Sequence, residues 1–135
     1  MAAVISEGEI SLEFLDALFA RAFFKTSIDS DGDLYVSEGL DFPIWLSVSP
    51  NQKVIRYSTY VTRDAESSTA FTHIEANTLN REILLARFYA HEERPDVVSA
   101  DYYMTFKDGA IDSQIIAVAR RFSGAFVAGV RGLDR

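Results

Sequence analysis

The 135-residue sequence contains no cysteine, which excludes a disulfide scaffold, a thiol nucleophile and a cysteine-ligated metal. It also lacks any run of roughly 20 apolar residues, the length that a membrane-spanning helix needs. Basic residues are few, because 13 Lys and Arg stand against 20 Asp and Glu and give a formal net charge of −7. A nucleic-acid-binding surface needs a basic stripe. We therefore expect neither a nucleic acid nor a membrane as a partner.

Motifs that carry catalytic chemistry are missing as well. The sequence contains no GxxxxGK[ST] or GxGxxG phosphate loop and no GxSxG nucleophile elbow. Its two histidines, His73 and His91, lack the HxxxH or HxH spacing of a metal pair and are interpreted as solvated side chains. Glu92 and Glu93 are adjacent in a charged turn, which does not suit the paired acid and base of a catalytic site. We expect no catalytic residue, metal or cofactor, and hence no enzyme.

The remaining composition is that of a folded protein. A chain of this length can bury a sizeable core, and a hydrophobic content of 48% argues against disorder. The first residues, MAAVISEGEI, lack the basic segment and apolar run of a signal peptide, so we expect a cytoplasmic location. Because no repeat, linker or low-complexity segment interrupts the sequence, we expect one domain over residues 1–135.

Apolar residues spaced three and four apart predict a helix near each end of the chain. The first covers about residues 11–25 and carries an aromatic stripe that makes it a main contributor to the core. The last begins at Asp112 or Ser113, either of which can cap it, and we expect it to end near Gly129.

A third helix is predicted over residues 65–83, where neither Gly nor Pro interrupts the sequence, with Asp64 or Ser67 as its cap. Asn77 and Asn80 lie one turn apart near the edge of its apolar stripe. Asn is a poor interior helix residue because its amide competes for backbone hydrogen bonds. The favoured interpretation is a structural polar pair that ties the helix to a neighbouring loop or strand. Contact with a polar ligand is the alternative.

Residues 27–38, SIDSDGDLYVSE, resemble the calcium-binding loop of an EF-hand. Ser27 stands at the first position, where a carboxylate is expected, and Gly39 and Pro43 interrupt the helix that should follow. The Asp-Gly pair is typical of a turn or hairpin. An acidic turn is therefore the favoured interpretation, and weak calcium binding is the alternative.

Alternating apolar and polar residues predict five strands, and the short links between the first three indicate an antiparallel meander. The predicted order is α-β-β-β-α-β-β-α, an α+β fold in which helices pack mainly on one face of an antiparallel five-stranded sheet. The predicted strands lie near residues 34–36, 42–48, 54–61, 84–90 and 98–107.

This arrangement leaves the other face of the sheet uncovered, with aromatic residues beside Arg56 and Arg87. Protein interfaces are enriched in aromatic residues and Arg, although Tyr and Trp also favour strands in general. The face is therefore either a binding surface or an ordinary exposed surface. The candidate partner-binding residues are Tyr35, Trp45, Tyr60, Tyr89 and Tyr103.

Three short stretches in a characteristic order carry a family resemblance. They are the DGDL turn at residues 31–34, the NTLN helix segment at 77–80 and the ARF strand start at 86–88; the final helix with Phe122 also fits. With these features the sequence resembles the YbjN family, described broadly as bacterial sensory transduction regulators. The resemblance implies a fold similar to type III secretion chaperones, often dimeric. It implies no established enzymatic activity and no transferable functional residues.

Three hypotheses about function follow. The first is a non-catalytic, chaperone-like regulatory module that acts as a homodimer and binds another protein or peptide. The second is a small-molecule or ion sensor that uses Asn77, Asn80 and the 29–38 turn. The third and least favoured is an enzyme, which would need a pocket with perturbed titratable groups.

Overall fold

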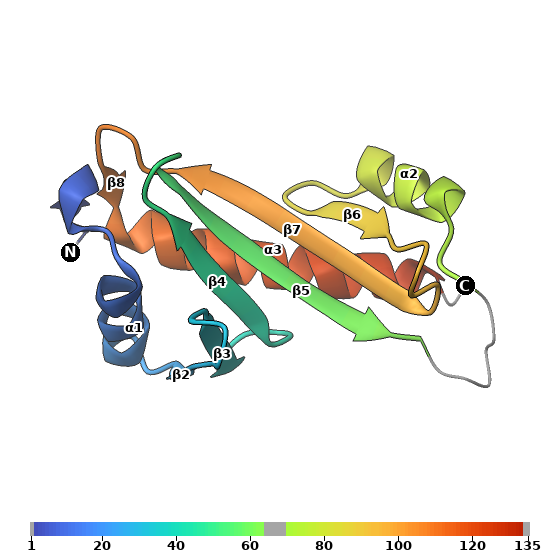
Figure 1. Ribbon diagram of the computed structural model, residues 1–135, viewed down its shortest axis with the longest axis horizontal. Helices are drawn as coiled ribbons and strands as arrows, with labels where there is room; N and C mark the ends of the chain where they lie inside the picture. The colour runs from blue at the N-terminus through green and yellow to red at the C-terminus, as the bar shows by residue number, and fades with distance from the viewer. Residues whose placement is uncertain (1, 64–69, 134–135) are drawn as a thin grey trace.

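The computed structural model describes residues 2–63 and 70–133. Within them the chain forms three α-helices, a short 3₁₀ helix and eight strands in two antiparallel sheets (Figure 1). The helices are α1 (Leu12–Arg21), α2 (His73–Glu82) and α3 (Asp112–Leu133), and the 3₁₀ helix covers Glu7–Glu9. The strands are β1 (Val4–Ile5), β2 (Lys25–Ile28), β3 (Leu34–Glu38), β4 (Ile44–Ser49), β5 (Val54–Thr62), β6 (Arg87–Ala90), β7 (Val97–Thr105) and β8 (Ala110–Ile111).

The main sheet has six strands in the order β2-β3-β4-β5-β7-β6, and β1 pairs with β8 in a separate two-stranded sheet. Strands β5 and β7 form the centre of the main sheet. They pair along their whole length, from Val54 opposite Thr105 to Thr62 opposite Val97. Every neighbouring pair in both sheets is antiparallel, so the predicted α+β class and antiparallel pairing are confirmed.

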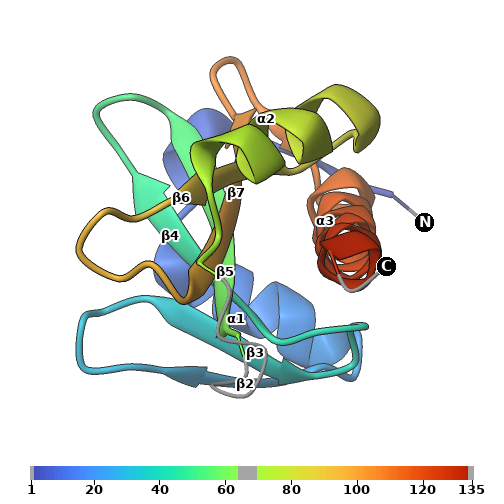
Figure 2. The same cartoon turned by 90° about the vertical axis from the view of Figure 1, so that its right-hand side faces the viewer.

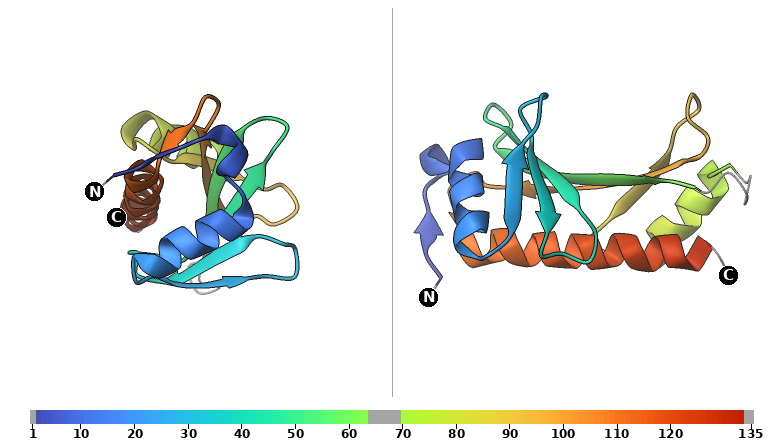
Figure 3. Two further views of the ribbon diagram at one scale, coloured as in Figure 1. Left: turned by 90° about the vertical axis from the view of Figure 1, so that its left-hand side faces the viewer. Right: turned by 90° about the horizontal axis from the view of Figure 1, so that it is seen from below.

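All three α-helices lie on the same side of the main sheet (Figures 2 and 3). Helix α3 runs along the length of the sheet, α1 packs at the β2–β3 end and α2 packs beside β6. The core lies between these layers, where Tyr57 is fully buried and its hydroxyl donates to the Ile115 carbonyl of α3 at 2.9 Å. The far face of the sheet is therefore not covered by any helix of the described residues.

Polar side chains tie two helices to the sheet. In α2, Asn80 donates through Nδ2 to the Phe88 carbonyl at 3.0 Å and accepts through Oδ1 from the Phe88 N–H at 2.7 Å. In α3, the buried Ser123 hydroxyl donates to the Phe42 carbonyl and accepts from the Phe42 N–H. Asn80 thus ties α2 to β6 through two hydrogen bonds, and both Asn77 and Asn80 are exposed.

The structure corrects the predicted number of strands, because β2 adds a sixth strand to the predicted five. Its four residues are mostly exposed at the edge of the sheet, so they lack the apolar alternation that marks the other strands. It pairs with β3, with Ile28 opposite Leu34, so the acidic segment is a hairpin turn as the favoured interpretation predicts. The strands of the small sheet have two residues each, too short for a periodic pattern.

The predicted helix bounds also need correction. Helix α1 stops at Arg21, because Phe23 adopts a left-handed backbone conformation with φ of 71°. Helix α2 begins at His73, where Thr72 and Glu75 form a capping box. The predicted caps Asp64 and Ser67 lie outside the described residues.

Helix α3 continues through Gly129, where the sequence predicts its end, and reaches Leu133. Gly129 is buried, and a Cβ atom at this position would collide with the Phe88 ring of β6. Its function is therefore close approach of helix and sheet rather than helix termination. Among the described residues, no helix combines the length and apolar character needed to cross a membrane.

Candidate functional site

The open face of the sheet carries a row of three neighbouring aromatic rings. Tyr35 on β3 stands opposite Trp45 on β4, with ring centroids 4.7 Å apart. Trp45 in turn stacks on Tyr60 of β5 at 5.4 Å, with an angle of 8° between the ring planes. Alternation places these side chains opposite the buried core residues of the same strands. We call Tyr35, Trp45 and Tyr60 the aromatic row.

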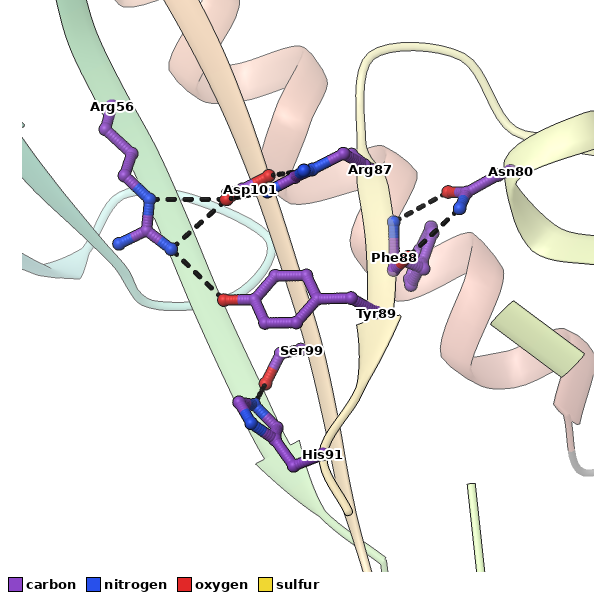
Figure 4. Close-up of polar contacts among 8 residues, drawn as sticks. All are labelled: Arg56, Asn80, Arg87, Phe88, Tyr89, His91, Ser99 and Asp101. Carbon is purple, nitrogen blue, oxygen red and sulfur yellow. Dashed lines mark hydrogen bonds and ion pairs between the residues drawn. The ribbon is translucent and has the colours of Figure 1, made fainter. Parts of the chain in front are cut away.

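Beside the aromatic row lies a buried carboxylate shared by two arginines (Figure 4). Asp101 on β7 is 1% exposed and receives two 2.8 Å hydrogen bonds from Arg87 on β6, one to each oxygen. Arg56 on β5 donates from Nε at 3.3 Å and from Nη2 at 3.2 Å, both to Oδ2. Register explains the Arg87 pair, since Arg87 and Asp101 are direct cross-strand partners.

Tyr89 and Tyr103 belong to this second group. Arg56 donates from Nη2 to the Tyr89 hydroxyl at 3.1 Å, and its guanidinium lies 6.0 Å from the Tyr103 ring centroid. The Arg87 guanidinium lies 5.5 Å from the Tyr89 ring centroid, within reach of a cation–π contact. We call these five residues the arginine cluster. The structure therefore places all five predicted aromatic residues on one face but divides them between two groups.

His91 is part of this surface too, contrary to its interpretation as a simple solvated side chain. Its Nε2 lies 2.8 Å from the hydroxyl of Ser99, which is 3% exposed. Its ring makes an edge contact with Tyr89 at 5.2 Å between centroids. His73, by contrast, is exposed at the first position of α2. His91 thus borders the arginine cluster at the start of the β6–β7 turn.

A cleft of about 430 Å³ crosses the open face between two hairpin turns. Both turns extend from the sheet on the side away from α3 (Figure 2). The β2–β3 turn lines the cleft with Asp29, Asp31 and Asp33, and the β6–β7 turn lines it with His91 and Arg94. Two members of the aromatic row, Trp45 and Tyr60, lie between these turns and also line the cleft. Carboxylates and cationic or titratable nitrogens therefore face the same space.

The acidic turn is held by one of its own carboxylates. Asp29 Oδ1 accepts hydrogen bonds from the backbone N–H groups of Asp31 and Asp33, both at 3.0 Å. Partial burial raises the pKa of Asp33, the nearby Asp29 and Asp31 charges raise it further, and Arg56 acts in the opposite direction. In the described part of the chain, no group of three or more acidic or histidine side chains is arranged to hold a metal ion.

Asp101 and Ser99 belong to this face although the sequence pattern predicts no role for them. A charged residue on the strand near 98–107 is a usable signal, because it alternates with apolar positions and shares a face with Tyr103. Its partners cannot be identified in this way. Arg56 precedes Asp101 by 45 positions in the sequence, and α2 and β6 are inserted between their strands.

Comparison with known proteins gives the family. The YbjN family model, described as "Putative bacterial sensory transduction regulator", matches residues 11–130. The chain belongs to the YbjN family. No match was found among curated proteins. The fold of this YbjN chain is similar to a structure described as "Crystal structure of YbjN, a putative transcription regulator from E. coli". The TM-score is 0.67 at 12% sequence identity, over 89% of this chain and 88% of the other.

The family assignment confirms the resemblance drawn from the sequence. The part of the YbjN chain that matches the family model includes the aromatic row, the arginine cluster and both turns that border the cleft. At 12% identity the likeness to the E. coli protein concerns the fold alone. The role of the open face in this YbjN chain must therefore be argued from its own side chains.

Proposed function

We propose that this chain is a non-catalytic regulatory module that binds a protein or peptide segment on the open face of its sheet. The observation that carries the proposal is the combination of the aromatic row and the adjoining cleft on a face that no helix of the described residues covers. Tyr60 and Tyr103 remain 45% and 49% exposed there. Large aromatic residues and Arg account for most of the binding energy in many protein interfaces.

Rigidity of this face also supports binding. Arg56 is held by Asp101 and Tyr89, and Arg87 is held by Asp101, so these long side chains are already ordered without a partner. Ordering a flexible side chain on binding costs about 0.5–1.5 kcal/mol. A preorganised surface avoids much of this cost. A regulatory role agrees with the description of the YbjN family as sensory transduction regulators.

The test of partner binding compares affinity capture by the wild-type chain and by Tyr60→Ala and Trp45→Ala variants in the native bacterial host. Loss of a central aromatic residue is expected to reduce capture of specific partners by a factor of about 30, corresponding to about 2 kcal/mol. Ile74→Ala is the matched control, because Ile74 is 79% exposed on α2, away from the open face. Identical sets of captured proteins for all four chains would refute the proposal.

We also propose that the module acts as a homodimer, as the family resemblance implies. The outer edge of β2 pairs with no other strand among the described residues, so it offers a surface for association. Size-exclusion chromatography with light scattering at about 10 μM measures the mass directly, since dimers of micromolar affinity are populated at that concentration. A strict monomer would contradict the dimer without affecting the binding face.

The cleft supports a second candidate function, a small-molecule sensor. Its volume of about 430 Å³ lies within the range of about 300–1,000 Å³ typical of small-ligand sites. A thermal-shift screen with calcium and common metabolites tests this function, because a bound ligand stabilises the chain by mass action. A ligand at 100 times its Kd adds about 2.7 kcal/mol, so a flat screen would remove the basis for a sensor.

A further inference from the structure

The two walls of the cleft differ in charge, and the difference suggests which chemical group enters it. Asp29, Asp31 and Asp33 line one wall, and none of them takes part in an ion pair among the described residues. The nearby cation of Arg56 is already bonded to the buried Asp101 carboxylate and to Tyr89. Arg56 and Arg94 also line the cleft, and the Arg56 charge acts on Asp33, so two cations face three carboxylates and the lining keeps a net negative charge.

The rings between the walls favour the same kind of ligand. Trp45 and Tyr60 are stacked and both line the cleft, so a group that enters it meets aromatic surface next to the carboxylates. Trp45 lies between the rings of Tyr35 and Tyr60, whereas Tyr60 contacts no second ring among the described residues and is 45% exposed. A cation over the free side of Tyr60 is attracted by the negative face of the ring, and partial desolvation strengthens this attraction. A planar guanidinium can at the same time form paired hydrogen bonds with a carboxylate. Carboxylates beside aromatic rings thus select a cation over a neutral or anionic group.

The geometry points to a positively charged side chain, best matched by arginine, as the group of the bound segment that enters this cleft. This inference rests on the proposed protein-binding function and adds the chemistry of the partner. The cation lies between the acidic wall and the aromatic row. Arg94 on the opposite wall can donate hydrogen bonds to carbonyl or carboxylate oxygens of the same segment.

The only tryptophan of the chain reports on this site, because Trp45 lines the cleft. The ¹⁵N-labelled full chain therefore gives a single indole N–H signal, which can be followed during titration with N-acetyl-arginine amide. N-acetyl-citrulline amide is the matched control ligand, since it has nearly the same shape and no charge. We expect a saturable shift of the indole signal with the arginine ligand, with a Kd on the order of 1–10 mM for so small a probe.

Variants localise the effect to the acidic wall. Asp33→Asn removes one carboxylate and is expected to weaken binding of the arginine ligand about two- to fivefold, as for a partly exposed ion pair. Adding Asp31→Asn should weaken it further, and Asp29 is left intact because its carboxylate holds the turn. Asp108→Asn is the control, because it removes the same charge from an exposed turn outside the cleft. Its left-handed φ of 67° is also well tolerated by Asn.

Three results would overturn the inference. They are an equal response to the citrulline ligand, an equal loss of affinity in Asp33→Asn and Asp108→Asn, and no saturable shift up to about 50 mM ligand, well above the expected Kd. Tighter binding of free arginine than of a blocked Gly-Arg-Gly peptide would assign the cleft to a small molecule instead. Partner capture that depends on Trp45 but not on Asp33 would remove the cationic ligand and leave the proposed function intact.

Discussion

Replacing Asp101 by Asn tests how the open face is held together. The change keeps the size of the side chain and removes the charge that accepts four hydrogen bonds from Arg56 and Arg87. Hydrogen bonds to a charged group contribute about 1.5–3 kcal/mol when buried, and exposed ion pairs contribute about 0.2–1 kcal/mol. Asp101 is 1% exposed, but the side chains of Arg56 and Arg87 are 35% and 65% exposed, which places this cluster between the two cases.

We expect Asp101→Asn to lower the free energy of unfolding by about 2–3 kcal/mol. The two arginines can turn toward water, so the loss should stay below the 3–5 kcal/mol typical of a charge left unpaired in the interior. A domain of this size is stable by roughly 7–20 kcal/mol, so the variant should still fold. Urea unfolding followed by circular dichroism gives the change as the slope m times the shift in midpoint.

Double-mutant cycles with Arg87→Met and Arg56→Met then separate the effects of geometry and burial. Arg87 has the shorter, two-oxygen contact at 2.8 Å, whereas Arg56 has contacts of 3.2 and 3.3 Å but is less exposed. If the length of the hydrogen bonds matters more than the exposure of the arginine, the coupling energy with Asp101 is about 1–2 kcal/mol for Arg87 and about 0.5–1 kcal/mol for Arg56. A larger coupling for Arg56 would refute this reasoning, as would a loss below about 0.5 kcal/mol in Asp101→Asn.

Three further predictions concern single side chains. Gly129→Ala should destabilise the chain by about 1–3 kcal/mol through a collision with a buried ring, whereas Gly132→Ala, with open space around it, should be neutral or stabilising by up to about 1 kcal/mol. Equal urea midpoints for these two variants would contradict the packing argument. Asn80→Ala should lower the free energy of unfolding by about 1–2 kcal/mol, because the Phe88 N–H and carbonyl of β6 lose their partner. Asn77→Ala should leave the free energy of unfolding unchanged. Similar losses in both variants would show that the hydrogen bonds of the Asn80 amide contribute little to stability. Because folding raises the pKa of Asp33, ionisation of Asp33 lowers the free energy of unfolding as the pH rises. Asp33→Asn should therefore unfold at a higher urea concentration than the wild-type chain at pH 7. This difference should vanish below pH 3.8, the ordinary pKa of Asp, and a difference that persists there would contradict the raised pKa of Asp33.

The faces of the sheet were predictable because alternation is a local property of each strand. Leu34, Val36 and Leu46 alternate with polar or aromatic neighbours, and all three are buried as the pattern predicts. The start of α2 was also available locally, since Thr72 and Glu75 fit the capping-box pattern. The helix is predicted to begin at residue 65 because neither Gly nor Pro follows there. That absence is a weaker signal for a helix start than the capping box at Thr72.

The contents of the candidate site depend on pairing between distant strands, and no local pattern encodes it. Register places Arg56 opposite Tyr103 and Ser58 opposite Asp101. A shift of one residue between β5 and β7 would move every one of these side chains to the other face. The cleft depends in addition on two hairpin turns that are distant in the sequence. Asp33 and His91, the lining residues of the two turns that are closest in sequence, are 58 positions apart. Sequence patterns therefore identify the open aromatic face and the acidic turn, but not that two distant turns border one cleft.

The arginine cluster gives the open face a second layer of side chains, which explains how a charged residue can be 1% exposed on a face without a helix. Arg56, Arg87 and the neighbouring tyrosine rings cover Asp101 and are held in place by it. In the proposed function the arginine cluster supplies rigidity and the aromatic row supplies contact area for the partner. Loss of Asp101 should therefore reduce stability and partner binding together. Loss of Tyr60 should reduce binding of the proposed partner with little change in stability, because nearly half of this side chain is already exposed, at 45%.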